Sequence, residues 1–113
     1  MPLSNIFVHH VFFWLRNPGS ATDRAALIAG LKKLSKAAMI KQFHIGEAAG
    51  TNREVIETSY AVSWLLFFDT PADQDLYQTD PIHLLFVKEC SPLWSKVVVY
   101  DSVDANAPNA PIT

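Results

Sequence analysis

Two segments rich in aromatic and β-branched residues constrain the fold of this 113-residue chain more than any other feature. Residues 6–15 and 59–68 predict β-strands, because such side chains suit a pleated surface. Side chains alternate between the two faces of a strand, and in both segments each face is largely apolar. The fold must therefore cover the sheet on both sides.

Alternation assigns each side chain of the first strand to one of these faces. One face carries Ile6, Val8, His10, Phe12 and Trp14, and the other carries Phe7, His9, Val11, Phe13 and Leu15. In the second segment one side carries Tyr60, Val62, Trp64, Leu66 and Phe68. We expect the His10 face of the first strand to point towards the helices.

Capping residues mark the starts of the helices. Ser20, Thr70 and Asp80 are good N-caps, and the last two precede a proline that suits the first helical position. The predicted elements are strands at 6–15, 39–47, 59–68 and 96–101, helices at 21–36, 71–79 and 81–90, and a loop at 48–54.

The order β-α-β-β-α-β is typical of the ferredoxin-like α+β fold, in which a four-stranded antiparallel sheet carries its helices on one face. The helices bury only that face. The other face would form an apolar patch too large for a soluble monomer to expose. Two copies can bury this patch against each other under two-fold symmetry, so we expect a homodimer.

Composition favours one domain at residues 1–103, followed by a flexible tail at 104–113. A net charge of -2, with Lys and Arg scattered, argues against nucleic-acid or anionic-membrane partners. The apolar run at 6–15 holds two histidines and is too short to span a membrane. A single cysteine, Cys90, allows no intrachain disulfide, which favours a cytoplasmic location, and we interpret Cys90 as a packing residue.

The sequence predicts no cofactor and no metal. Its four glycines form no phosphate-binding loop, and neither a His-x3-His pair nor paired cysteines occur. A metal site made of His10, His44 and His83 is the alternative, but it requires three distant segments to converge.

Tyr77 and His83 are the strongest candidates for chemistry. They flank Asp80-Pro81, so His83 is expected at the third position of a helix, where the helix dipole disfavours its protonation. A neutral imidazole beside a phenol could accept and donate protons near neutral pH. The alternative is that both residues are ordinary packing and first-turn residues.

Several short segments, in their order and spacing, are similar to one known family. These are His10 to Arg16, Ser59-Tyr60, Tyr77 with Pro81 and His83, and Pro92-Leu93-Trp94 followed by Val97 to Asp101. Over about residues 6–103 the chain resembles the stress-responsive A/B barrel domain (Dabb) family. The resemblance implies a homodimeric barrel of two sheets with helices outside. The family includes plant olivetolic acid cyclase, and Tyr77, His83 and His10 resemble its Tyr-x5-His pair and first-strand histidine.

This resemblance implies an aldol-type cyclase or lyase acting on a small carbonyl compound. His83 would be the base, Tyr77 the donor and His10 a proton relay. The expected apolar walls of a pocket for a small hydrophobic ligand are Phe12, Trp14, Tyr60 and Trp64. The aromatic first strand, with Phe13 and Trp14, predicts less room than a long acyl chain needs.

Whether the chain is an enzyme stays open at this point. One alternative is a noncatalytic stress-associated dimer whose pocket is filled by its own aromatic side chains. Another is a cofactor-independent monooxygenase of the wider dimeric barrel superfamily. Asp101 could orient a histidine or be a solvated carboxylate at a strand end. An open, partly polar cavity bordered by His10, Tyr77 and His83 would favour the enzyme, and a solid core would favour the noncatalytic dimer.

Overall fold

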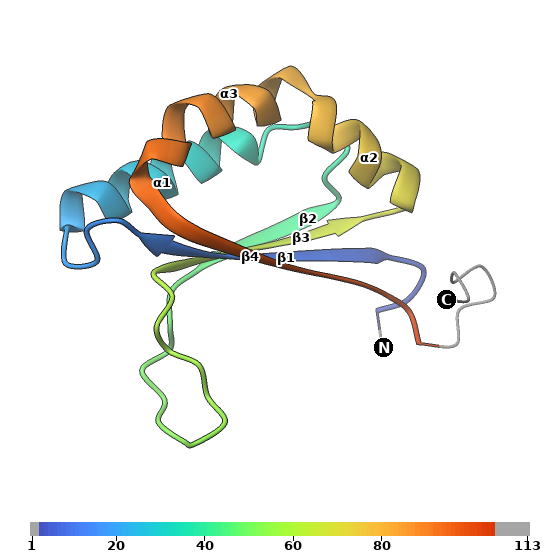
Figure 1. The fold of residues 1–113 in the computed structure, drawn as a ribbon. Coiled ribbons are helices and arrows are strands. Elements are labelled where there is room, and N and C mark those ends of the chain that lie inside the picture. Colours follow the sequence, from blue (N-terminus) through green and yellow to red (C-terminus); the bar gives the residue numbers. More distant parts are fainter. Residues whose placement is uncertain (1–2, 106–113) are drawn as a thin grey trace.

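The computed structural model describes residues 3–105 and confirms the ferredoxin-like α+β class. Its elements are β1 (Phe7–Leu15), α1 (Ala21–Leu34), β2 (Gln42–Gly46), β3 (Val62–Phe68), α2 (Pro71–Thr79), α3 (Pro81–Cys90), the 3-10 turn η1 (Ser91–Leu93) and β4 (Trp94–Val103). The sheet has the order β2-β3-β1-β4 with every neighbouring pair antiparallel. All three helices lie on one side of it (Figure 1). None of the described helices is long and apolar enough to cross a membrane.

The helices begin where the capping residues predict. The Ser20 hydroxyl accepts a hydrogen bond from the Asp23 N–H, and the Thr70 hydroxyl accepts one from the Asp73 N–H, both at 3.1 Å. Asp80 serves two helices, because its N–H donates to the Tyr77 carbonyl of α2 and its carboxylate accepts from the Ile82 N–H of α3. This double role sets the short turn between α2 and α3.

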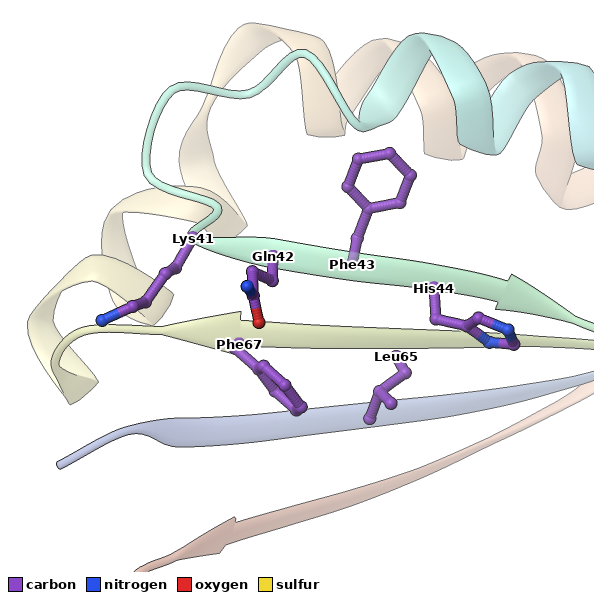
Figure 2. A pocket seen from close by; sticks show the side chains of 6 residues that line it. All are labelled: Lys41, Gln42, Phe43, His44, Leu65 and Phe67. Atoms are coloured by element: carbon purple, nitrogen blue, oxygen red, sulfur yellow. The ribbon is translucent and has the colours of Figure 1, made fainter. Parts of the chain in front are cut away.

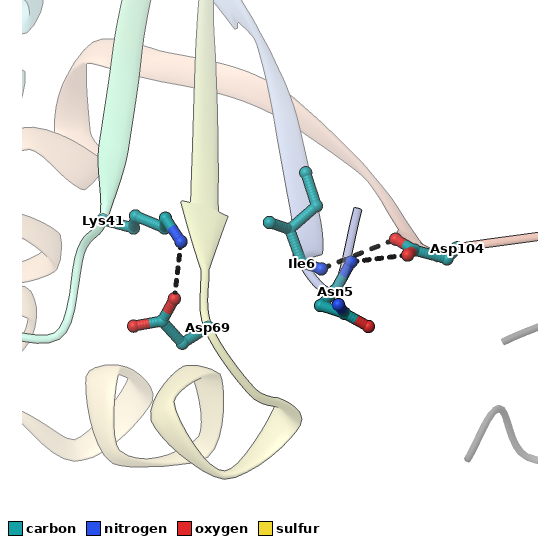
Figure 3. A network of polar contacts seen from close by, with 5 residues as sticks. All are labelled: Asn5, Ile6, Lys41, Asp69 and Asp104. Atoms are coloured by element: carbon teal, nitrogen blue, oxygen red, sulfur yellow. Dashed lines mark hydrogen bonds and ion pairs between the residues drawn. The ribbon is translucent and has the colours of Figure 1, made fainter. Parts of the chain in front are cut away.

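The last strand is longer than the predicted 96–101. Ser102 and Val103 pair with Val8 and Phe7 of β1. The chain therefore stays in the sheet for two residues beyond the predicted end of the strand. The Asp104 carboxylate then accepts hydrogen bonds from the N–H groups of Asn5 and Ile6 at 2.5 and 3.5 Å (Figure 3). Most of the expected tail, residues 106–113, lies outside the described residues.

The core fills the space between the sheet and the helices. Leu27, Leu31 and Leu34 of α1 are fully buried, as their helical spacing predicts, and burying each contributes about 2 kcal/mol. Cys90 packs against Gly30 of α1, and its sulfur fills the space that a side chain at position 30 would need. Burial raises the pKa of the Cys90 thiol. The packing interpretation of Cys90 fits this environment.

The opposite side of the sheet is uncovered in the single subunit, and we call it the open face. Figure 2 shows Gln42, His44, Leu65 and Phe67 pointing to this side, away from the helices, while Phe43 points towards them. The register places His10 beside Leu65 on β3 and beside Tyr100 on β4, so these three side chains share the open face. The open face also carries Val8, Phe12, Trp14 and Val98.

Candidate functional site

A cavity of about 290 Å³ lies between the sheet and the helices. Its polar lining comes from His9, Gln74, Tyr77, Gln78, His83 and Asp101. Its apolar lining includes Val11, Phe13, Trp64, Phe86, Trp94 and Val97. Titratable side chains from β1, α2, α3 and β4 therefore converge on one small, mostly apolar space, an arrangement typical of a ligand site.

Tyr77 and His83 come together at this cavity. Asp80 ends α2 and begins α3, and this turn brings the two rings to a centroid separation of 4.6 Å at an angle of 60°. The predicted juxtaposition across the helix junction is thus present in the structure. Such a pair can move a proton to or from a ligand held between the helices and the sheet.

Tyr77 is 1 % exposed, and within residues 3–105 its hydroxyl has one hydrogen-bond partner, Trp64. The Trp64 indole N–H donates to the Tyr77 oxygen at 3.1 Å. Because an indole can only donate, the Tyr77 oxygen accepts this bond and keeps its own proton for another acceptor. Burial raises the pKa of Tyr77, an effect that the Trp64 bond opposes, so the phenol stays protonated at neutral pH.

His83 offers a nitrogen that nothing within residues 3–105 occupies. Its Nδ1 is buried and has no hydrogen-bond partner there, which is costly unless a ligand or water fills the position. Burial lowers the pKa of the His83 imidazole, the Gln78 backbone and Asp80 act in the opposite direction, and His9 adds to the decrease. The ring is therefore neutral at pH 7 and can accept a proton.

The second histidine of the site is His9, and the prediction that His10 faces the helices is wrong. His9 is 6 % exposed and lines the cavity, with its ring centroid 6.1 Å from that of Tyr77. Its Nδ1 lies 2.6 Å from the Asp101 carboxylate oxygen. The His10 ring lies on the open face, where it packs on Phe12 at a centroid separation of 4.3 Å.

The error has a physical cause. Adjacent residues on a strand point to opposite faces, and both faces of β1 are apolar, so alternation alone could not decide which histidine looks inwards. The available signal was Asp101, because a carboxylate on the last strand can pair only with a histidine on its own face. The register places Asp101 directly opposite His9.

The predicted apolar walls divide between the two sides of the sheet. Trp64 lines the cavity as expected, but Phe12, Trp14 and Tyr60 gather on the open face instead. Tyr60 precedes β3, so it does not follow that strand's alternation, and its ring packs on Phe12 and Trp14 at 5.0 and 6.4 Å.

Other aromatic side chains form the wall that the sequence assigned to Phe12, Trp14 and Tyr60. Phe13 contacts Trp94 and Phe86 at centroid separations of 5.0 and 6.2 Å, and all three line the cavity. Phe13 thus takes up space on the helix side, as the sequence suggests. Trp14 does not, because it belongs to the open face.

The three-histidine metal alternative is also wrong. His10 and His44 are on the open face and His83 is on the helix side, so the sheet separates them. Among residues 3–105 no group of three or more His, Cys, Asp or Glu side chains is placed to hold a metal ion.

Two further hollows lie on the open face. One, of about 430 Å³, is formed by β2 and β3 around His44 and Phe67 (Figure 2). The other, of about 480 Å³, surrounds His10 and Lys96. Both open on the apolar surface that we expect a second copy to cover, whereas the helix-side cavity is lined by Tyr77 and His83.

Fold and site together define a ferredoxin-like α+β domain with a small, mostly apolar pocket beneath its helices, into which a few polar side chains converge. The model of the Stress Responsive A/B Barrel Domain (Dabb) family matches residues 7–104, and the chain belongs to this family. No sequence among the curated proteins matches the chain.

Solved structures confirm the fold. A Dabb family protein from Mesorhizobium loti is 20 % identical, with a TM-score of 0.74, and the match covers 89 % of this chain and 98 % of that one. Hydroxynitrile lyase from Passiflora edulis is 24 % identical, with a TM-score of 0.76 and coverage of 93 % and 98 %. A dimeric ferredoxin-like protein of unknown function from Thermobifida fusca is 17 % identical, with a TM-score of 0.73 and coverage of 91 % and 94 %.

Proposed function

We propose that this protein is a homodimeric, cofactor-independent enzyme that uses acid–base chemistry to form or cleave a carbon–carbon bond in a small carbonyl compound. One observation carries the proposal. The Tyr77 and His83 rings line the same half-open cavity with their centroids 4.6 Å apart, and the buried His83 Nδ1 has no hydrogen-bond partner within residues 3–105. An acid and a base with shifted pKa values in a cleft are typical of a catalytic site.

The proposed reaction is an aldol-type step. His83 takes a proton from the carbon beside a carbonyl, while the Tyr77 hydroxyl donates a hydrogen bond to the oxygen on which negative charge develops. The enolate carbon then bonds to a second carbonyl carbon, and the alkoxide formed there takes the proton back from the His83 imidazolium. Run in reverse, the same steps cleave the bond, which is a lyase reaction.

Trp64 and Asp101 support this assignment of roles. The Trp64 N–H occupies a lone pair of the Tyr77 oxygen, so the phenol acts as a donor towards the substrate. Asp101 engages Nδ1 of His9, which leaves Nε2 of that ring for the cavity. We assign His9 the proton-relay role that the resemblance implies for His10.

The cavity volume bears on substrate size. About 290 Å³ lies at the lower end of the range for small-molecule sites, and Phe13, Phe86 and Trp94 bound it. A compound of one aromatic ring and a short side chain fits this space, whereas a long acyl chain does not. The lyase form of the proposal agrees with the hydroxynitrile lyase among the structures of the same fold.

The homodimer rests on the open face. Val8, Leu65, Phe67 and Val98 are apolar and lie on the side that no helix covers. Burying this surface in an isologous two-fold contact satisfies both subunits at once. Relatives of the same fold are described as dimeric, which supports this arrangement.

The test uses two small probes, 2,6-heptanedione for aldol closure and the cyanohydrin of benzaldehyde for cleavage. In the second, His83 would take the hydroxyl proton, the bond to the nitrile carbon would break, and the released cyanide would take that proton back. We expect turnover of at least one. His83→Ala should abolish it, and Tyr77→Phe should lower kcat more than it raises KM, because the hydroxyl acts on charge that develops in the transition state. His44→Ala, a histidine on the open face, is the matched control and should leave kcat unchanged. If the parent protein turns over neither probe and binds neither at His83, the noncatalytic dimer is the better account.

A further inference from the structure

The connection between β2 and β3, residues 47–61, extends away from the sheet on the side opposite the helices (Figure 1). These fifteen residues, all of them described, form no helix or strand, and the Ile56 N–H donates to the Arg53 carbonyl at 2.8 Å within them. Connections of this length inside a small domain are uncommon, and they are usually either functional segments or linkers. We call residues 47–61 the arm.

The second half of the arm is held firmly where it joins the sheet. The Trp14 indole N–H donates to the Ser59 hydroxyl at 2.9 Å, and the Ser59 N–H donates to the Glu57 carboxylate at 3.0 Å. At Ala61 the N–H donates to the Phe13 carbonyl at 2.8 Å, and the carbonyl accepts from Arg24 of α1 at 2.9 Å. These bonds fix the direction in which the arm leaves the sheet.

The base of the arm is also part of the open face. Tyr60 packs on the open-face rings of Phe12 and Trp14. Farther out, Val55 is 80 % exposed, although its side chain is apolar. In the single subunit the arm therefore carries an apolar residue into solvent beyond the apolar face to which it is anchored.

We propose that the arm of each subunit packs against the second copy of the chain, with Val55 buried in that contact. This inference rests on the proposed homodimer and adds a second contact region to it. Facing sheets pack about 10 Å apart, so a segment that stands out from the open face must lie alongside the partner's sheet. Two-fold symmetry then gives the dimer two arms, each covering part of the other subunit.

A mixed dimer tests the contact directly. One preparation carries a nitroxide label on Val55→Cys, and the other is unlabelled except for ¹⁵N. Native Cys90 is buried and the pKa of its thiol is raised, so the nitroxide reagent reacts with the introduced cysteine at position 55 and not with Cys90. In a one-to-one mixture, only contact between subunits can broaden the ¹⁵N-detected amide signals. We expect broadening of a localised set of amides, which disappears when the nitroxide is reduced.

Variants measure how much the arm contributes. Val55→Glu should weaken the dimer by at least about tenfold in sedimentation equilibrium, because each dimer contains two such contacts. Leu84→Glu is the matched control, since Leu84 is apolar and 55 % exposed but lies on α3, on the helix side of the sheet. It should leave the dimer constant unchanged.

The outcomes separate the two proposals. A parent protein that sediments as a monomer overturns both the homodimer and the arm contact. A parent dimer with no broadening between subunits, or with equal dimer constants for Val55→Glu and the parent, overturns the arm contact and leaves the open-face dimer standing.

Discussion

Protonation of one residue, His83, couples the candidate site to pH. Its pKa is lowered chiefly by burial, so the unfolded chain takes up the proton first as the pH falls. The contribution of His83 to folding is therefore complete above about pH 6.5, the free-histidine value, and decreases as the pH falls below it. We expect the free energy of unfolding to fall between pH 7 and 5, with a smaller fall in His83→Gln. Urea titrations at each pH measure it, and equal slopes for the two proteins would show that His83 is not buried as described.

Trp64 is the residue on which the donor role of Tyr77 depends. Trp64→Phe removes the indole N–H and leaves a smaller ring in a fully buried position. We expect a loss of about 2 to 3 kcal/mol in the free energy of unfolding, from one hydrogen bond and part of a buried side chain. Trp14→Phe, on the open face, should cost the isolated fold less. Urea unfolding of both variants provides the measurement, and equal losses would contradict the assigned environments.

At the scale of elements, Asp80 ends α2 and begins α3, so the stability of these two helix ends is linked to the geometry of the site. Its carboxylate caps α3 and its N–H closes α2, so Asp80→Ala should cost about 1 kcal/mol and loosen the Tyr77 and His83 pair. Thr70→Ala removes a comparable cap at the far end of α2. Both variants should lose similar stability in urea, but only Asp80→Ala should shift the His83 ring resonances strongly. Equal shifts would contradict this specific role of the turn.

On the scale of the whole molecule, the open-face histidines predict a dimer that weakens in acid. His10 and His44 both lie beside Leu65, and His10 shares a hollow with Tyr100, Lys96 and Glu57. The His10 pKa is lowered by burial, then by His44 and His9, and a second copy would bury the ring further. The dimer constant should therefore weaken as the pH falls below about 6.5.

Sedimentation of the parent protein and of His10→Gln/His44→Gln at pH 7.5 and 5.0 measures this effect. The parent dimer should be weaker at the lower pH, and the double variant should show a smaller change. A parent dimer constant that does not vary with pH would mean that these histidines stay outside the interface.

The sequence by itself determined the features that local chemistry encodes. Ser20, Thr70 and Asp80 mark the helix starts because a cap bonds only to its own first turn, and the apolar side chains of residues 6–15 require cover on both faces. The short distance between Tyr77 and His83 was predictable for the same reason, because only the short turn at Asp80-Pro81 separates them in the sequence.

Only the tertiary structure decided which histidine lines the helix-side cavity. His9 and His10 are equally plausible on a strand with two apolar faces, and the choice depends on register with β3 and β4. Those strands lie more than fifty residues away in the sequence, and Asp101 meets His9 only after all of them have paired. A one-residue change of register would exchange every side chain between the helix side and the open face, so long-range pairing, and not local pattern, made the site.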